Sequence, residues 1–312
     1  RLPTPPQMHN HGNYIISLGA LGKWLAGQAE ALGVEIYAGF PAAEVLYHED
    51  GSVKGVATGD MGIGKNGEKT AAYQPGLELH AKHTVFAEGC HGSLTKQLIK
   101  KFNLRPDGHQ TYGLGVKEIW EVKPENHSQG RIIHTLGWPL DNITYGGSWL
   151  YHMEDNLVSI GYVVGLDYQN PYLSPFDEMQ RHKTHPALRN ILDGGERISY
   201  GARTLVEGGL QSLPKLTFPG GLLIGDSAGF LNVAKIKGNH AAIKSGILAA
   251  DALVAQIDAP ECTTYTDLFQ SSWLYDELYK VRNIRQGFHW GRFMGLIHAA
   301  FQTFGGWRLP YT

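Results

Sequence analysis

The feature that most constrains the fold is a short apolar strand that runs directly into a turn bracketed by glycines. Residues 222–224, Leu-Leu-Ile, predict a buried strand, and a long helix is predicted from about Gly238 to Ile257. Between them the chain reads Gly225-Asp226-Ser227-Ala228-Gly229-Phe230. A strand, a glycine turn and a helix in this order are typical of α/β proteins in which a parallel strand ends at a ligand.

The chemistry of this turn favours a nucleotide-like cofactor. Asp226, at the carboxyl end of a parallel strand, is placed to accept hydrogen bonds from a ribose-like or ribityl hydroxyl group. Gly225 and Gly229 let the backbone approach a flat ring without a Cβ clash. The helix that starts near Gly238 offers N–H groups and the positive end of its dipole, which suit the negative charge that develops on a reduced flavin. The alternative is a plain connection between a strand and a helix.

A second segment has a related pattern. A predicted strand ends at Ala87, and Glu88, Gly89 and Gly92 follow it before a helix over residues 94–102. Ala-x-Gly-x-x-Gly in this position is similar to the second nucleotide-contacting segment of many FAD proteins, although it also fits an ordinary strand-to-helix connection. Residues 62–67 spell Gly-x-Gly-x-x-Gly as well, but no helix follows, and Asn-Gly at its end predicts a hairpin turn.

The middle of the chain predicts an antiparallel sheet, with strands at residues 113–120 and 157–164. One aromatic strand carries Gly146 and Gly147 in the run Tyr-Gly-Gly-Ser-Trp. Glycine inside a strand indicates a bulge or a close approach of backbone. A flat quinone ring needs apolar walls and main-chain partners for its carbonyl groups, so this pair is a candidate quinone site, with a bulge as the alternative.

Other elements follow from periodicity and turn residues. We expect a helix that ends at Gly33, strands at residues 34–37, 43–47 and 53–58, and helices at residues 174–182 and 186–192. His182 and His185 are expected to be surface or capping residues. The buried side of the long helix after Gly238 is expected to comprise Ile243, Ile247, Ala250, Val254 and Ile257.

Composition narrows the classes of function. The net charge of −2 gives no reason to expect a nucleic-acid partner. Cys90 and Cys262 are expected to be reduced, and two cysteines cannot supply the four thiolates of an iron–sulfur cluster. Since the histidines also lack partners in a zinc pattern, we expect no metal site in this chain. The sequence does not begin with Met, and we expect that an N-terminal portion precedes it.

Several runs resemble electron-transfer flavoprotein:ubiquinone oxidoreductase, an FAD-dependent redox family. The resemblance extends over essentially the whole chain. It is carried by residues 11–14, 86–92, 145–148, 165–172, 215–221, 232–238 and 278–285.

This resemblance implies a mixed α/β fold, with part of a Rossmann-like FAD-binding domain and an antiparallel-sheet ubiquinone-binding domain. The implied domains are an FAD-binding part at residues 1–110, the ubiquinone-binding domain at 111–214, a return to the FAD-binding domain at 215–258, and a membrane-associated or linker segment at 259–312. The implied cofactor-binding residues are Glu88, Gly89, Gly92, Gly225, Asp226, Gly229, Phe230, Asn232, Gly238 and Asn239 for the flavin, and Gly146 and Gly147 for the quinone.

The implied activity is electron transfer from reduced electron-transfer flavoprotein, through FAD, to membrane ubiquinone. A 4Fe–4S cluster would take part in the intact protein without ligands from this chain. The cofactors carry the chemistry, so no catalytic side chain is expected. The implied location is the matrix face of the mitochondrial inner membrane, or the cytoplasmic face of a bacterial membrane, with peripheral attachment.

The sequence departs from the family pattern in several places. It contains neither the first Gly-x-Gly-x-x-Gly strand and helix nor the cluster cysteines. Asn239 stands where the family often has Thr, and Ser17 stands where a basic residue is expected on a strand. Two alternatives remain, a related FAD-dependent reductase such as a prenyl (geranylgeranyl) reductase, and a non-catalytic interaction scaffold.

The stretch at residues 288–307 is expected to help dock the protein on a membrane surface through a broad apolar helical face. Its apolar residues are Phe293, Met294, Leu296, Ile297, Ala300, Phe301 and Phe304, with Trp290, Arg292, Trp307 and Arg308 near the ends. Aromatic and cationic residues at the ends of such a helix are typical of an interfacial position. A helix packed in the protein core is the alternative.

Overall fold

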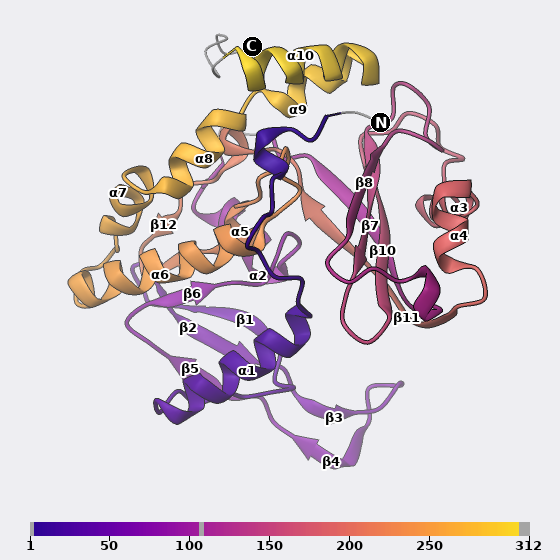
Figure 1. The fold of residues 1–312 in the computed structure, drawn as a ribbon. Helices are drawn as coiled ribbons and strands as arrows, with labels where there is room; N and C mark the ends of the chain where they lie inside the picture. The colour runs from indigo at the N-terminus through magenta and orange to yellow at the C-terminus, as the bar shows by residue number, and fades with distance from the viewer. Residues whose placement is uncertain (1–2, 106–108, 306–312) are drawn as a thin grey trace. The chain divides into compact units, whose positions relative to one another are not determined.

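The computed structural model describes residues 3–105 and 109–305 and divides into two compact units. The first, here called the sheet unit, comprises Arg1–Glu35, Thr111–Glu207 and Val281–Thr312. The second, here called the cradle unit, comprises Ile36–Gln110 and Gly208–Lys280. Figure 1 shows the chain with its elements labelled.

Five antiparallel strands form the centre of the sheet unit, in the order β11-β7-β10-β9-β8. Their bounds are Tyr112–Glu121 (β7), Ile132–Leu136 (β8), Gly146–His152 (β9), Leu157–Gly165 (β10) and Glu196–Val206 (β11). The antiparallel sheet predicted for the middle of the chain is therefore confirmed. Strands β7 and β10 extend the two predicted strands by one or two residues.

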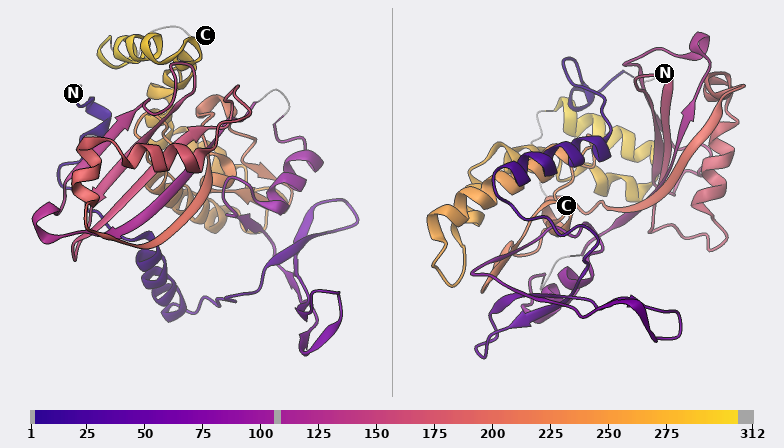
Figure 2. Two further views of the ribbon diagram at one scale, coloured as in Figure 1. Left: turned by 90° about the vertical axis from the view of Figure 1, so that its right-hand side faces the viewer. Right: turned by 90° about the horizontal axis from the view of Figure 1, so that it is seen from below.

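Helices α3 (Pro175–Lys183) and α4 (Pro186–Leu192) lie across one face of this sheet, as the left view of Figure 2 shows. Side chains alternate between the two faces of a strand, so every second residue of β10 packs toward these helices. These core residues of β10 are Val158, Ile160, Tyr162 and Val164, and Met179 of α3 is buried with them.

The two histidines of this region differ. His185 caps α4 by accepting a hydrogen bond from the Ala187 N–H group at 3.2 Å, as expected for a capping residue. His182 is buried against the ring of Tyr162, so the expectation of a surface or capping role is wrong for this residue. Burial lowers the pKa of His182 to about 4, which keeps its imidazole neutral in the core.

The sheet unit also contains both ends of the described chain. Its helical elements are η1 (Pro6–Met8), α1 (Leu18–Ala31), η2 (Pro124–Asn126), α9 (Ile284–Gly287), η4 (Phe288–Trp290) and α10 (Arg292–Phe304). Ser17 accepts a hydrogen bond from the Ala20 N–H group at 3.3 Å and is the N-cap of α1, so its expected place on a strand is wrong. Gly33, with φ of +88°, ends the helix as predicted. The strand predicted at residues 34–37 is absent, because no described strand pairs with this exposed segment.

Three small sheets and several helices form the cradle unit. One sheet joins β1 (Ala42–Tyr47), β2 (Val53–Thr58) and β5 (Glu78–His80), all antiparallel. A second joins β12 (Thr217–Phe218), β13 (Gly221–Leu223) and β6 (Thr84–Phe86), with β13 parallel to β6. Strands β3 (Met61–Ile63) and β4 (Lys69–Gln74) form a hairpin over the Gly-x-Gly-x-x-Gly run, which confirms the predicted turn.

The helical elements of the cradle unit are α2 (Ser93–Lys101), η3 (Leu210–Ser212), α5 (Gly225–Ala228), α6 (Asn239–Gln256), α7 (Thr264–Gln270) and α8 (Trp273–Val281). Helix α6 agrees closely in length with the predicted long helix. Its buried side was predicted wrongly, since Ala250 and the isoleucine and valine residues at 243, 247, 254 and 257 are exposed. The buried residues of α6 are Ala241, Ser245, Leu248, Ala249 and Ala252.

Candidate functional site

The parallel pairing of β6 and β13 brings the two predicted cofactor-binding segments together. Phe86 of β6 pairs with Leu223 of β13, so the two strands end side by side. Beyond those ends, the Ser227 hydroxyl group donates a hydrogen bond to the Gly89 carbonyl oxygen at 3.3 Å. Segments that are far apart in the sequence therefore form one site at the carboxyl ends of parallel strands, where α/β proteins place ligands.

The turn after β13 depends on its two glycines. Gly225 has φ of +55° and Gly229 has φ of +97°, a region that residues with a side chain rarely adopt. The Gly225 N–H group donates to the buried Ser245 hydroxyl oxygen at 2.9 Å, which ties the turn to α6. Phe230 follows the turn and is fully buried, so it anchors the loop in the core.

Glu88 has a role that the sequence did not reveal. Its carboxylate accepts hydrogen bonds from the N–H and hydroxyl groups of Thr95, both at 2.7 Å, and so caps the start of α2. A Cβ atom at Gly92 would lie only 2.5 Å from the Glu88 side chain, so this glycine leaves the space for the cap. The positive end of α2 therefore already faces a carboxylate of the chain. Glu88 and Gly92 stabilise the conformation of this segment through that cap.

The start of α6 is different, because no side chain caps it. Gly238 is the N-cap residue, and Asn239 is the first residue of the helix. The Asp226 carboxyl group lies beside Gly238, with Oδ1 3.5 Å from the position that a Cβ atom would take there. Burial raises the pKa of Asp226. A helix start without a side-chain cap, next to a half-buried carboxyl group, fits a ligand that accepts hydrogen bonds at one edge and donates them at another.

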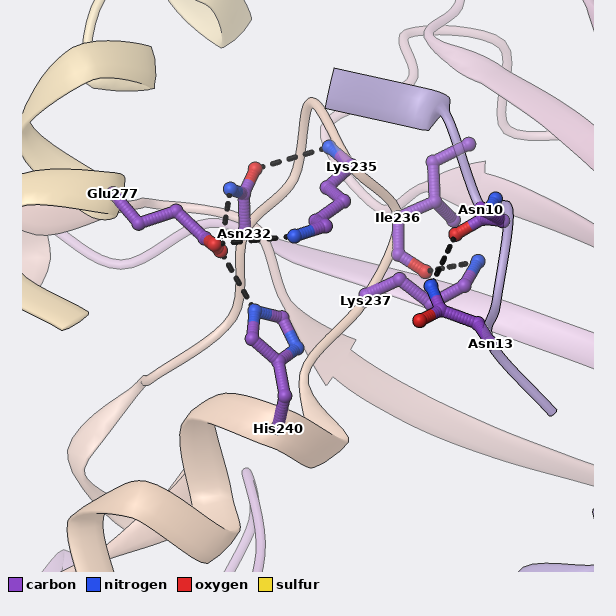
Figure 3. Close-up of polar contacts among 8 residues, drawn as sticks. All are labelled: Asn10, Asn13, Asn232, Lys235, Ile236, Lys237, His240 and Glu277. Atoms are coloured by element: carbon purple, nitrogen blue, oxygen red, sulfur yellow. Dashed lines mark hydrogen bonds and ion pairs between the residues drawn. The ribbon is translucent and has the colours of Figure 1, made fainter. Parts of the chain in front are cut away.

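The loop that leads into α6 is held by a carboxylate that the sequence reasoning missed. Glu277 of α8 accepts hydrogen bonds from the Asn232 side-chain amide at 2.9 Å, from Lys235 Nζ at 3.1 Å and from His240 Nε2 at 2.7 Å (Figure 3). Burial would raise the pKa of Glu277, but the hydrogen bonds from His240 and Asn232 outweigh it and lower this pKa to about 2. Asn232, predicted to lie near the flavin, uses its side chain to hold this loop.

One residue of this loop has a strained backbone. Ile236 has φ of +56°, and a β-branched side chain is disfavoured in that region. The paired backbone groups of Asn232 and Lys237 on either side keep the loop in this conformation. Such strain is retained where the surrounding structure over-determines it, as often happens next to functional sites.

In the sheet unit, the glycine pair at Gly146 and Gly147 lies in a regular strand. The register of β9 with both neighbouring strands continues without a shift, so the alternative of a bulge is wrong. Instead, the backbone of this glycine pair lies close to the backbones of the two neighbouring strands. A Cβ atom at Gly146 would lie 2.4 Å from the Val163 carbonyl oxygen, and one at Gly147 would lie 2.3 Å from the Thr135 carbonyl oxygen.

A pocket lies where β9 begins. Its empty volume is about 210 Å³, part of it open to solvent. The residues that line it are Leu136, Gly137, Asn142, Ile143, Thr144, Tyr145, Gly146, Phe288 and Arg292. Gly146 is among them, whereas Gly147 is not. The rings of Tyr145 and Phe288 meet edge to face at 5.1 Å, so the pocket has the flat aromatic surfaces that suit a planar ring.

Helix α10 starts at this pocket and exposes its apolar side. Arg292, the first residue of α10, lines the pocket. Phe293, Ile297 and Phe301 are each at least half exposed. The core alternative is thus not supported by the described residues, and the predicted end residues Trp307 and Arg308 lie outside them. No described helix is long and apolar enough to cross a membrane.

Among solved structures, the fold is similar to those of flavin-dependent enzymes. A geranylgeranyl bacteriochlorophyll reductase-like protein from Thermoplasma acidophilum aligns with a TM-score of 0.64 at 16% identity, covering 92% of this chain and 72% of that chain. The flavin-dependent brominase Bmp2 aligns with a TM-score of 0.60 at 16% identity, covering 91% of this chain and 65% of that chain. The predicted mixed α/β flavoprotein fold is thereby confirmed.

Sequence comparison indicates a particular family within this fold. Residues 112–205 match the model of the ETF-QO ubiquinone-binding domain. The chain is 57% identical over 316 residues to the mitochondrial electron transfer flavoprotein-ubiquinone oxidoreductase of Homo sapiens, covering 96% of this chain and 51% of that protein. It is 52% identical over 320 residues to the enzyme of that name from Pseudomonas aeruginosa, covering 99% of this chain and 58% of that protein.

These comparisons confirm the resemblance that the sequence indicated. The chain is similar to electron transfer flavoprotein-ubiquinone oxidoreductases over nearly its whole length. It spans about half the length of the curated relatives it matches.

Proposed function

We propose that this chain is part of an FAD-dependent oxidoreductase that passes electrons from reduced electron-transfer flavoprotein to membrane ubiquinone. The observation that carries the proposal is the match of residues 112–205 to a ubiquinone-binding family model. These residues comprise α3, α4 and all but the last residue of the antiparallel sheet. The identity of 57% to named relatives supports the same function. The prenyl reductase alternative has weaker support, because the reductase-like protein from Thermoplasma acidophilum is similar to this chain in fold but only 16% identical in sequence.

The cradle unit is the proposed FAD site, and its residues fit that cofactor. Asp226 would accept hydrogen bonds from hydroxyl groups, while Gly225 and Gly229 would let the backbone approach the ring. The N–H groups at Asn239 and the following residues of α6 would stabilise negative charge on the ring edge. When bound, FAD would accept and deliver the electrons, and in the intact protein a 4Fe–4S cluster held by residues outside this chain would take part.

Replacement of Asp226 by Asn tests this site. We expect flavin affinity in the full-length protein to fall about 10-fold, because the amide presents only one acceptor oxygen to the hydroxyl groups. The apoprotein should be at least as stable as the wild type, since burial disfavours the ionised carboxyl group. Flavin content is read from absorption near 450 nm. Unchanged flavin affinity in Asp226→Asn would place the cofactor elsewhere.

The pocket at the start of β9 is the proposed ubiquinone site. Tyr145 and Phe288 would contact the faces of the quinone ring, and Gly146 would offer backbone groups at its edge. The lipophilic tail of ubiquinone must leave the pocket toward lipid. The pocket lies at the start of α10, whose exposed apolar side offers such a route.

We propose that α10 docks peripherally on the membrane. An exposed stripe of aromatic and aliphatic side chains on a short helix favours a position in the interface, on the mitochondrial inner membrane or a bacterial cytoplasmic membrane. Replacement of Phe293, Ile297 and Phe301 by Ser should leave a folded protein that binds liposomes at least 10-fold more weakly. Unchanged liposome binding by the folded triple variant would argue against docking through α10.

A further inference from the structure

A buried charged cluster lies next to the proposed quinone pocket and is not explained by the fold alone. It consists of Glu207, which follows β11, Arg285 of α9, Asp167, which follows β10, and Tyr145, which precedes β9. All four residues belong to the sheet unit. Arg285 is the centre of the cluster, with only 7% of its side chain exposed.

The contacts of Arg285 define the geometry. Its Nε atom lies 3.4 Å from Glu207 Oε2, and its Nη2 atom donates to Asp167 Oδ2 at 2.9 Å. Its guanidinium carbon lies 4.1 Å from the centre of the Tyr145 ring. Tyr145 also lines the pocket, so this residue links the charged cluster to the pocket.

Two glycines leave space for the carboxyl groups. A Cβ atom at Gly113 would lie 2.4 Å from Glu207 Oε1, and one at Gly165 would lie 2.8 Å from Asp167 Oδ1. A residue with a side chain at either of these two positions would displace the acidic group beside it. The sheet therefore has a built recess for two carboxyl groups around one guanidinium group.

If both carboxyl groups were ionised, the two negative charges of Glu207 and Asp167 would exceed the single positive charge of Arg285. Asp167 makes the shorter contact with Arg285 and is 37% exposed, while the side chain of Glu207 is 3% exposed and makes the longer contact. The Arg285 charge is thus best matched by Asp167, and the buried Glu207 is the group that keeps a proton. Burial raises the pKa of Glu207 to about 7, against the opposing effect of Arg285 and with a further rise from Asp167.

We propose that Glu207 is a proton donor for quinone reduction and acts through Tyr145. This inference rests on the proposed function of the pocket. Reduction of ubiquinone adds two electrons, from the reduced flavin, and two protons, one to each ring oxygen. Glu207 gives its proton, through a bridging water molecule, to the Tyr145 hydroxyl oxygen as that hydroxyl group passes its own proton to one quinone oxygen. The other quinone oxygen takes its proton from water at the open side of the pocket. The resulting carboxylate is held by Arg285 and is protonated again from water between turnovers.

Among the described residues, Arg285 is the only side chain that makes a hydrogen bond or ion pair with the Glu207 carboxyl group. The carboxyl group lies over Gly113 of β7, where an added Cβ atom would lie 2.4 Å from Glu207 Oε1 and 3.1 Å from the apolar side chain of Val163. The charged and titratable groups that face Glu207 in the described residues are therefore Arg285, Asp167 and Tyr145. Burial, followed by the charge of Glu207, raises the pKa of Tyr145, so its hydroxyl group stays protonated and serves as a relay.

The test uses the full-length protein with bound flavin, reduced with dithionite without oxygen. Flavin reoxidation is followed after mixing with a short-chain ubiquinone, which needs protons, or with ferricenium, which takes an electron and no proton. We expect Glu207→Gln to slow reoxidation by quinone on the order of 10²-fold at pH 6 and to leave reoxidation by ferricenium unchanged. The wild-type rate with quinone should fall as the pH rises through about 7, and Glu207→Gln should abolish this dependence.

A second variant and a control sharpen the result. Asp167→Asn leaves Arg285 to Glu207 alone, so the pH at which the quinone rate falls should shift to a lower value. Glu178→Gln, which alters an arginine-paired carboxylate of α3, should leave both rates and the pH profile unchanged. An unchanged pH profile in both Glu207→Gln and Asp167→Asn would overturn the proposal. Failure of the wild type to reduce quinone at any pH would instead contradict the proposed function.

Discussion

The glycine pairs of the two units differ in the structural reason for which glycine is needed. In the cradle unit, Gly225 and Gly229 are required by their positive φ angles, and a Cβ atom at Gly225 would meet only ordinary contacts. In the sheet unit, Gly146 and Gly147 have no positive φ angle, and a Cβ atom there would collide with neighbouring strands. The first pair allows a turn, whereas the second allows tight strand packing, so a glycine pair in a sequence does not by itself identify a ligand site.

The largest effect that follows from this comparison is expected at Gly147. Gly147→Ala places a Cβ atom against the Thr135 carbonyl oxygen, and the backbone there cannot move without breaking the sheet. We expect a loss of about 3 kcal/mol or more in the free energy of unfolding, measured by urea titration. Gly201→Ala in β11 is the matched control, since nothing lies within 4 Å of its Cβ position. Equal effects of the two variants would show that close packing does not explain Gly147.

A change of nearly the same size is expected at Glu207, and it depends on pH. The pKa of Glu207 in the folded protein, about 7, is above the ordinary value of 4.5. Its contribution to stability is therefore complete below about pH 4.5 and is lost as the pH rises through 7. Glu207→Gln removes this dependence. We therefore expect the free energy of unfolding of the variant, relative to that of the wild type, to rise by about 2 to 3 kcal/mol from pH 5 to pH 8. A constant difference at both values would contradict the assigned burial.

A smaller effect is expected where the cradle unit depends on one hydrogen bond. Ser245→Ala removes the acceptor of the buried Gly225 N–H group and should cost about 1.5 kcal/mol. It should also weaken flavin binding, because the turn at Gly225 loses its tie to α6. Ser271→Ala, at an exposed hydroxyl group that donates to the Asp267 carbonyl oxygen, should change stability by less than about 0.5 kcal/mol. A cost at Ser245 no greater than that at Ser271 would show that the turn does not depend on this bond.

Local sequence patterns predicted most of the elements that position the two sites. Turn residues and alternation placed β2 and α4 at their observed bounds, and the strand–glycine–helix order placed the turn at Gly225. Both segments were predicted to bind the cofactor, and they meet because β6 and β13 are parallel and end at the same edge of their sheet.

Features that depend on tertiary packing were not predicted. Both sides of α6 carry apolar residues, so helical periodicity could not decide between the side with Ile243 and the side with Leu248. The roles of Glu277 and Glu207 depend on partners many residues away and on burial, which no spacing rule reports. Residues 34–37 are of types that favour a strand, but no described strand pairs with them.

The claim that the pocket of the sheet unit binds quinone is tested most directly by filling it. Ile143 lines the pocket and is 54% exposed, so Ile143→Trp adds volume there without disturbing the core. The measurement is reoxidation of the reduced flavin by a short-chain ubiquinone in the full-length protein, with Ile198→Trp at an exposed site of β11 as the control. The proposed site predicts at least a 10-fold slower reoxidation in Ile143→Trp, with normal flavin absorption and a normal rate in the control. A normal rate in a folded, flavin-loaded Ile143→Trp variant would contradict the assignment of this pocket to the quinone.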